Sequence, residues 1–173
     1  MVVVMEFFME RIRTRNKMEG TIAIYPGSFN PFTVGHQNIL EKAERIFGEG
    51  NVIIAIGVNP DKTPNYLDVN KYSRVETVRN QLPSATVEGY EGFLTEYVRE
   101  KMEETGKRVV VIRGLRNGHD FDYEYNSSHF CWDQFPEMNI IMIPCDPMYI
   151  HISSSAYRQL EKIKPGAGHY LLA

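Results

Sequence analysis

The sequence predicts a single α/β domain built on a doubly wound, five-stranded parallel sheet. Short apolar runs alternate with amphipathic stretches along the chain, its 173 residues suit one domain, and no internal repeat or second-domain linker interrupts the pattern. We expect strands at residues 22–25, 52–58, 86–89, 108–112 and 139–143. Helices are expected at residues 36–47, 71–82, 93–104, 120–135 and 153–162.

The apolar pattern justifies these elements in order. Residues 36–47 predict an amphipathic helix, because one face collects Ile39, Leu40, Ala43, Ile46 and Phe47. The continuous apolar run at residues 52–58 is typical of a strand covered on both faces. Gly106 can end the helix expected over residues 93–104, and the serines at residues 153–155 are good N-caps for the last helix.

Composition and charge limit the classes of function. The chain is 43% hydrophobic and 24% charged, and its formal net charge of −3 argues against general nucleic-acid binding. We therefore expect no nucleic-acid partner, and any anion site must be built locally. Cys131 and Cys145 lack the spacing of a metal site. We expect two free thiols and no protein-built metal site, which indicates a reducing, cytoplasmic location.

Residues 1–17 are expected to form an N-terminal extension outside the core domain, which spans residues 18–173. Their apolar start is short and is interrupted by Glu6, with no basic region before it and no small-residue cleavage site after it. It therefore predicts neither a signal peptide nor a membrane span, and we expect no membrane association.

Polar residues gather in the segments that follow the expected strands, at residues 27–36, 59–62, 91–92, 113–116 and 146–155. The carboxyl ends of parallel strands meet at one edge of a sheet, and ligands of doubly wound folds bind outside that edge. Lys62 follows the second strand, and Arg113 and Arg116 follow the fourth. The pattern predicts a site for a phosphate-bearing ligand, formed where these segments converge.

The first of these segments, residues 27–36, leads directly into a helix. Backbone N–H groups at a helix N-terminus favour phosphate, and His36 lies in the first turn, where its ring can reach a phosphate oxygen. The segment is neither a Walker A loop nor a G-x-G-x-x-G fingerprint. An alternative interpretation is that His36 only caps its own helix. Ser28, Gly27 and Gly35 beside it favour the phosphate-binding interpretation.

Arg113 and Arg116 stand on either side of Gly114, and an arginine fork matches phosphate geometry. The alternative is that they pair with Asp120 and Glu124 or are solvated. The serines at residues 153–155 cap a helix and also offer a phosphate cradle. No nucleophile–base pair and no dense carboxylate cluster are visible. Fixed positive groups without a nucleophile suit in-line phosphoryl or nucleotidyl transfer.

These motifs resemble a known family. Tyr25-Pro26-Gly27-Ser28-Phe29-Asn30-Pro31 with Thr33-Val34-Gly35-His36 is similar to the T/H-x-G-H motif of nucleotidyltransferases with a Rossmann-like fold. Arg113-Gly114-Leu115-Arg116, Asp120-Phe121-Asp122-Tyr123-Glu124 and Ile152-Ser153-Ser154-Ser155 follow in the order found in phosphopantetheine adenylyltransferases. The resemblance runs from about residue 21 to residue 162. It implies adenylyl transfer from ATP to 4′-phosphopantetheine in coenzyme A synthesis, giving dephospho-coenzyme A and pyrophosphate.

The resemblance also implies roles for particular residues. His36, Ser28, Lys62 and Arg113 would be the catalytic set, and Ser28, Lys62, Arg113 and Leu94 would bind the acceptor. The expected ATP site is larger: Ser28, Phe29, His36, Gly114, Leu115, Arg116, Glu124, Tyr149, Ile150, His151, Ile152, Ser153, Ser154 and Ser155. Mg²⁺ would accompany ATP, held mainly by its phosphates. The family further implies a homo-oligomer, a hexamer in its usual members.

Several positions depart from the family pattern, among them Asn117-Gly118-His119, which replaces a small apolar stretch. Asn30 stands where the family usually has Asp, and Cys131-Trp132 stands where it often has Asn-Arg beside the pantetheine arm. Two further functions therefore stay open: adenylyl transfer to another acceptor such as nicotinamide mononucleotide, and a non-catalytic nucleotide-binding module. The complete set of Ser28, His36, Lys62, Arg113 and Arg116 argues against the second.

Overall fold

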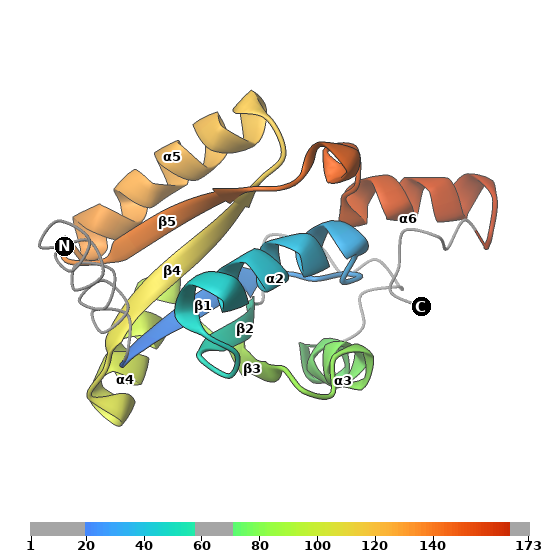
Figure 1. Ribbon diagram of the computed structural model, residues 1–173. Helices are drawn as coiled ribbons and strands as arrows, with labels where there is room; N and C mark the ends of the chain where they lie inside the picture. The colour runs from blue at the N-terminus through green and yellow to red at the C-terminus, as the bar shows by residue number, and fades with distance from the viewer. Residues whose placement is uncertain (1–19, 58–70, 167–173) are drawn as a thin grey trace, which may run out of the picture.

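The computed structural model describes residues 20–57 and 71–166, and its elements follow one another as strand and helix (Figure 1). They are β1 (Thr21–Gly27), α2 (Val34–Phe47), β2 (Val52–Gly57), α3 (Lys71–Gln81), β3 (Thr86–Tyr90), α4 (Leu94–Thr105), β4 (Arg108–Leu115), α5 (Gly118–Gln134), β5 (Asn139–Pro144), the 3-10 helix η1 (Pro147–Tyr149) and α6 (Ser154–Ile163). The extension expected over residues 1–17 lies outside the described residues.

The described strands form one parallel sheet in the order β3-β2-β1-β4-β5. Ala23 of β1 pairs with Val52 of β2, while Ile22 of β1 pairs with Val109 of β4. The chain thus runs outward from β1 to β3 and then returns to place β4 on the other side of β1. This confirms the predicted doubly wound sheet and puts its topological switch point between β1 and β4.

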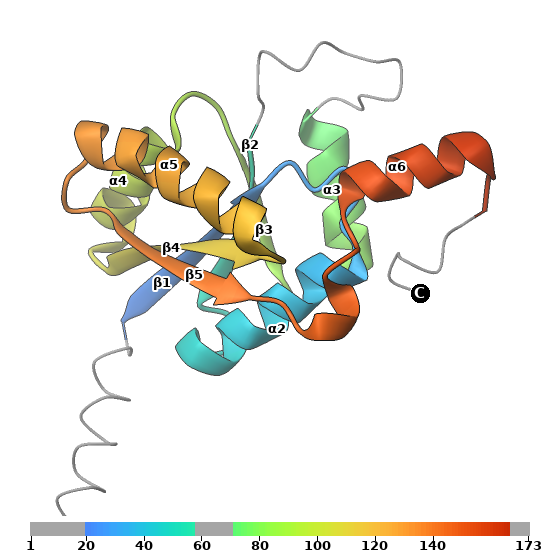
Figure 2. The same ribbon diagram turned by 90° about the horizontal axis from the view of Figure 1, so that it is seen from above.

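Helices cover both faces of the sheet, because successive side chains of a buried strand point to opposite faces. Ala23 and Tyr25 of β1 belong to a core cluster with apolar residues of α2 and α3. Ile22 and Ile24 belong to a second cluster, which includes Val98 of α4. Figures 1 and 2 show the same layers, with α2 and α5 on opposite sides of the sheet.

Two details of the prediction are wrong. We expected β4 to end at residue 112, but it continues to Leu115, because β5 runs beside it as far as the Leu115–Pro144 pair. Arg113 and Gly114 therefore lie on a strand and not in a loop. Ile46 was expected on the inward face of α2 but is 44% exposed, since the buried stripe is narrower and consists of Asn38, Ile39, Leu40, Ala43 and Phe47.

Helix α6 extends beyond the sheet in both views (Figures 1 and 2) and has no buried residue. Side chains near its start connect it to the segment after β1: Ser154 Oγ donates to the carbonyl of Pro31 over 2.8 Å, and Arg158 Nη1 donates to the carbonyl of Asn30. Among the described helices, none has both the length and the apolar composition needed to cross a membrane.

Candidate active site

A cavity of about 250 Å³ opens at the switch point, where β1 and β4 end side by side. Segments far apart in the sequence line it. The lining residues are Tyr25, Pro26, Gly27, Ser28, Phe29, Gly35, His36, Ile39, Arg113, Gly114, Leu115, Arg116, Asp120, Glu124, Cys145, Ile152, Ser153, Ser154, Ser155 and Arg158.

The segment after β1 has an unusual backbone at Phe29, whose φ is +42°. Few residues other than glycine adopt this left-handed region, and a bulky side chain there is disfavoured unless its surroundings hold it. The Phe29 ring is buried and packs against the rings of Tyr25, Phe32 and His36, with centroids 5.1 to 5.4 Å away. These contacts fix the segment at the mouth of the cavity.

His36 is the third residue of α2 and both caps the helix and lines the cavity. The backbone N–H of Thr33 donates to His36 Nδ1 over 3.0 Å, as the N3 side chain does in a capping box. In a neutral imidazole one nitrogen accepts and the other donates, so this bond places the ring proton on Nε2. His36 therefore offers the cavity an N–H donor.

Burial and, to a smaller extent, the positive charge of Arg116 together lower the pKa of His36 to about 4. The ring is accordingly neutral at pH 7. An ordinary histidine, with a pKa of about 6.5, would instead be partly protonated near physiological pH.

Arg113 lies on β4 with its Nε 3.2 Å from Glu124 Oε2 of α5. Both side chains are largely buried. Burial raises the pKa of Glu124, and the charge of Arg113 opposes that shift. Arg113 also lies close enough to Cys131 to lower the pKa of its thiol, although burial, the larger effect, raises it. Arg113 thus lines the cavity and also lies near Cys131 of α5.

Arg116 makes a bidentate pair with Asp120, with Nε and Nη2 each 2.7 Å from a carboxylate oxygen. The backbone N–H of Arg116 also donates to Asp120 Oδ2 over 2.9 Å. Burial disfavours the ionised form of Asp120, but the bonds from Arg116 outweigh it and lower the carboxyl pKa. Both arginines therefore have the carboxylate partners considered from the sequence, and both still line the cavity.

Gly114 allows a close approach between β4, β1 and α2. A Cβ at this position would lie 3.0 Å from Ile39 Cγ1 and 3.4 Å from the hydroxyl oxygen of Tyr25. Tyr25 is buried, and burial raises the pKa of its phenol far above the usual range. A larger residue at this position would therefore require Ile39 and Tyr25 to shift by a few tenths of an ångström.

The start of α6 closes the opposite side. Ser153 is the N-cap, and its hydroxyl accepts a hydrogen bond from the N–H of Ala156 over 3.0 Å. Arg158 Nη2 donates to Ser155 Oγ over 3.1 Å, so a cation stands one turn from the helix start. Cap hydroxyls, helix N–H groups and a guanidinium together suit anionic groups such as phosphates.

The structure brings most of the sequence-predicted residues to this one cavity: Ser28, Phe29, His36, Arg113, Gly114, Leu115, Arg116, Glu124, Ile152, Ser153, Ser154 and Ser155. Tyr149, Ile150 and His151 do not line it, since they lie in and just after η1, and Ile150 is 49% exposed. Leu94 packs instead with the cluster of α4 and α5, and the segment at residues 91–92 does not reach the cavity. Lys62 lies outside the described residues.

Sequence reasoning missed Tyr25, Ile39, Cys145 and Arg158 as lining residues. Tyr25 and Ile39 belong to apolar runs, where a residue facing a cavity looks like a core residue. Arg158 had a detectable signal: it lies four residues after Ser154, which places it on the same face of α6.

The strand order, the cavity at the switch point and its histidine and arginines define a nucleotidyltransferase of the Rossmann-like class. Residues 24–160 match the family model described as cytidylyltransferase-like. The phosphopantetheine adenylyltransferase of Thermosynechococcus vestitus is 32% identical over 152 residues, 88% of this chain and 86% of that protein. That of Clostridium novyi is 33% identical over 139 residues, 80% of this chain and 82% of that protein. The chain therefore belongs to the cytidylyltransferase-like family and, within it, to the phosphopantetheine adenylyltransferases.

The fold has a counterpart among solved structures. A protein from Vibrio parahaemolyticus, assigned as a nicotinate-nucleotide adenylyltransferase, superimposes with a TM-score of 0.62 over 88% of this chain and 87% of that one. The two sequences are 13% identical. At this identity the likeness supports the fold and says nothing about the acceptor.

Proposed function

We propose that this protein transfers the adenylyl group of ATP to 4′-phosphopantetheine, giving dephospho-coenzyme A and pyrophosphate. A phosphate oxygen of the acceptor attacks the α-phosphorus of ATP, and the bond to the β-phosphate breaks. One observation carries the proposal: a single cavity at the switch point joins His36, both arginines of the β4 end and the start of α6. The named relatives supply the identity of the acceptor.

His36 is the residue that we assign to the transition state. Its Nε2–H would donate to an oxygen of the α-phosphate, where negative charge builds up during transfer. The Thr33 bond fixes this neutral donor before the substrate binds, so the ring needs no reorganisation at the moment of reaction. Ser28 lies at the same mouth of the cavity and would contact both substrates.

The ATP phosphates would lie toward the start of α6, where Ser153, Ser154, Ser155 and Arg158 line the cavity. Arg116, Gly114 and Leu115 would contact the nucleoside side, with Glu124 beside them. From the family resemblance, Tyr149, Ile150 and His151 would close over adenine. They lie on the chain immediately before the lining residue Ile152.

The acceptor would bind on the Arg113 side. Arg113 lines the cavity and also lies near Cys131, so it can hold the acceptor phosphate close to the α-phosphate of ATP. Lys62 and Leu94 remain proposed acceptor contacts. Trp132 donates through Nε1 to the carbonyl of Met138 over 3.0 Å, and this bond fixes the indole. From the family pattern, the pantetheine arm would pass beside it.

Magnesium is the proposed cofactor and would enter with ATP. Within residues 20–57 and 71–166, His, Cys, Asp and Glu side chains form no group of three or more that could hold a metal ion. Mg²⁺ commonly binds through substrate phosphates and few protein ligands, which fits a cavity whose two carboxylates are paired with arginines. When bound, it would neutralise charge on the phosphates.

The test is a pyrophosphate-release assay with Mg²⁺ and ATP, run with 4′-phosphopantetheine, with nicotinamide mononucleotide and with no acceptor. We expect release only with 4′-phosphopantetheine, together with a new dephospho-coenzyme A peak by mass spectrometry. Release only with nicotinamide mononucleotide would show that this nucleotide, and not 4′-phosphopantetheine, is the acceptor. ATP binding with no release in any arm would indicate a non-catalytic module.

From the family resemblance, we also propose that the protein forms a homo-oligomer, namely a hexamer. Light scattering on the purified protein measures this directly. A monomeric mass would contradict it.

A further inference from the structure

Arg74 reaches the mouth of the cavity from a helix that does not line it. It lies on α3, and its Nη1 donates to the backbone carbonyl of Ser28 over 3.1 Å, across 46 positions of sequence. Its Nε is buried and has no hydrogen-bond acceptor among the residues that the structure describes. A buried polar atom without a partner is costly, so the partly buried Arg74 side chain is held in this place by its bond to Ser28.

The bond determines which way the peptide between Ser28 and Phe29 faces. In a planar trans peptide the C=O and the N–H point in opposite directions. Ser28 and Phe29 line the cavity and Arg74 does not. With the Ser28 carbonyl turned to Arg74, the N–H of Phe29 points away from Arg74, and Phe29 is itself a lining residue of the cavity.

This orientation of the Ser28–Phe29 peptide strains the backbone. Phe29 has a φ of +42°, which an aromatic residue rarely adopts. A flip of the Ser28–Phe29 peptide would move φ out of that region and would reverse the direction of the N–H. The Phe29 ring contacts Tyr25 and His36 and cannot follow such a change easily. The Arg74 bond therefore opposes a flip that the strained backbone favours.

We propose that Arg74 is a positioning residue, which holds the Phe29 N–H toward the cavity so that it can donate to a phosphate oxygen of ATP. This inference rests on the proposed function, since it assumes that ATP phosphates lie in this cavity. Arg74 acts through the Ser28–Phe29 peptide and does not itself contact the substrate.

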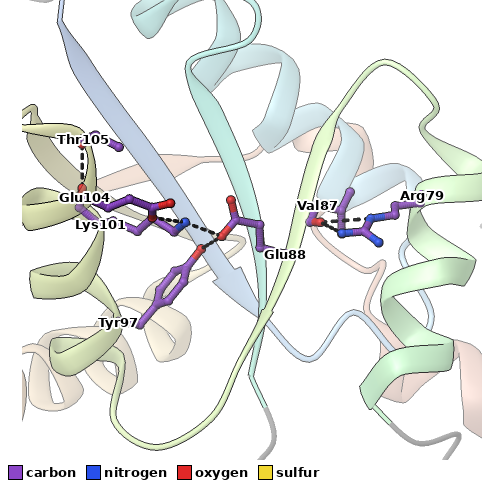
Figure 3. Close-up of polar contacts among 7 residues, drawn as sticks. All are labelled: Arg79, Val87, Glu88, Tyr97, Lys101, Glu104 and Thr105. Atoms are coloured by element: carbon purple, nitrogen blue, oxygen red, sulfur yellow. Dashed lines mark hydrogen bonds and ion pairs between the residues drawn. The ribbon is translucent and has the colours of Figure 1, made fainter.

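The same helix provides a matched control in Arg79. Arg79 also donates to a backbone carbonyl, that of Val87 in β3, through Nε at 3.1 Å and Nη2 at 2.7 Å (Figure 3). Neither Arg79 nor Val87 lines the cavity. Arg79→Met therefore removes a helix-to-strand bond of the same chemical kind without touching the phosphate segment.

The experiment compares Arg74→Met, Arg74→Lys and Arg79→Met with the wild type. It measures the melting temperature, the Kd of inorganic pyrophosphate by calorimetry, and kcat and KM for ATP. We expect Arg74→Met to weaken pyrophosphate binding and to lower kcat/KM for ATP by about tenfold or more, typical of losing one aligned donor to a charged group. Arg74→Lys keeps a donor and should recover part of the loss. Arg79→Met should change the melting temperature alone.

The inference is overturned if Arg74→Met matches Arg79→Met in pyrophosphate affinity and in kcat/KM, or if Arg74→Lys is no better than Arg74→Met. If Arg74→Met does not fold, Arg74→Gln is a second test, because glutamine is polar but too short to reach the Ser28 carbonyl. Wild-type levels of both readouts in a folded Arg74→Gln variant would also overturn it. Failure of the proposed function itself would be evident separately, as absent turnover in the wild type.

Discussion

The backbone N–H of Thr33 and Nδ1 of His36 are 3.0 Å apart, and this contact determines the chemistry that the ring can offer. Because Nδ1 accepts, the neutral ring carries its proton on Nε2. The interpretation of His36 as a helix cap is therefore correct, and it is compatible with a role in the cavity. The cap fixes the ring, and the other nitrogen is left to donate.

Removing the ring tests the role assigned to it. We expect His36→Ala to lower kcat by about two to three orders of magnitude, the usual cost of losing one donor to a developing oxyanion. ATP should still bind, because the start of α6 and Arg116 are unchanged. Pyrophosphate release gives kcat, and calorimetry gives the Kd of ATP. Near-normal turnover in a folded His36→Ala protein would rule out the role.

The lowered pKa of His36, about 4, predicts how stability depends on pH. Between pH 6.5 and pH 4 the unfolded chain binds a proton at this residue and the folded protein does not, so the free energy of unfolding falls as pH falls. The contribution is fully present above pH 6.5. Below pH 4 the free energy of unfolding is lower by roughly 3 kcal/mol, because each unit of pKa shift corresponds to 1.36 kcal/mol.

The comparison that isolates this effect uses His36→Gln, which keeps an acceptor for the Thr33 N–H but does not titrate. Urea unfolding of both proteins from pH 4 to pH 8 gives two stability curves. We expect the wild-type curve to fall more steeply below pH 6.5, with carboxylate titrations common to both. Parallel curves would show that His36 has an ordinary pKa.

The sequence predicted the strands and α-helices of the described residues from local patterns, such as the apolar runs of the strands and the amphipathic face of α2, but it gave no sign of the short helix η1. It placed the end of β4 wrongly, since residues after 112 continue as strand only because β5 pairs with them as far as Leu115. A pairing between distant segments is not visible in a local pattern. The same reason explains why Ile46 was wrongly expected to be buried. Its apolar side chain lies on the edge of the α2 stripe, and no described residue packs over it closely enough to bury it.

The candidate site divides in a similar way. His36, Arg113 and Arg116 could be predicted because glycines and strand ends mark their positions. Tyr25 could not be distinguished from the core, since it lies in an apolar run and is itself buried although it lines the cavity. Arg74 gave no signal either: one arginine on a helix is normally solvated, and its bond to Ser28 exists only in the folded protein.

Asp120 is predicted to hold Arg116 in position for ATP. Asp120→Asn would remove the bidentate pair, and we expect KM for ATP to rise by about five- to thirtyfold with a smaller effect on kcat. Stability should change by less than ~1 kcal/mol, because the pair is partly exposed. Glu104→Gln is the control, since Glu104 pairs with Lys101 far from the cavity at 2.7 Å (Figure 3). Equal KM values in the two variants would contradict the prediction.

Asn38 joins α2 to the segment after β5, and its loss should cost stability rather than chemistry. Its buried amide donates to Asp146 Oδ2 over 2.8 Å and accepts from the N–H of Asp146 over 2.9 Å. Asn38→Ala would leave that N–H without its partner, and we expect the free energy of unfolding to fall by about 1–3 kcal/mol. Glu41→Ala, on the exposed face of the same helix, should stay within ~0.5 kcal/mol of the wild type. Urea unfolding measures both variants, and equal midpoints would show that the Asn38–Asp146 bonds do not hold this side of the fold.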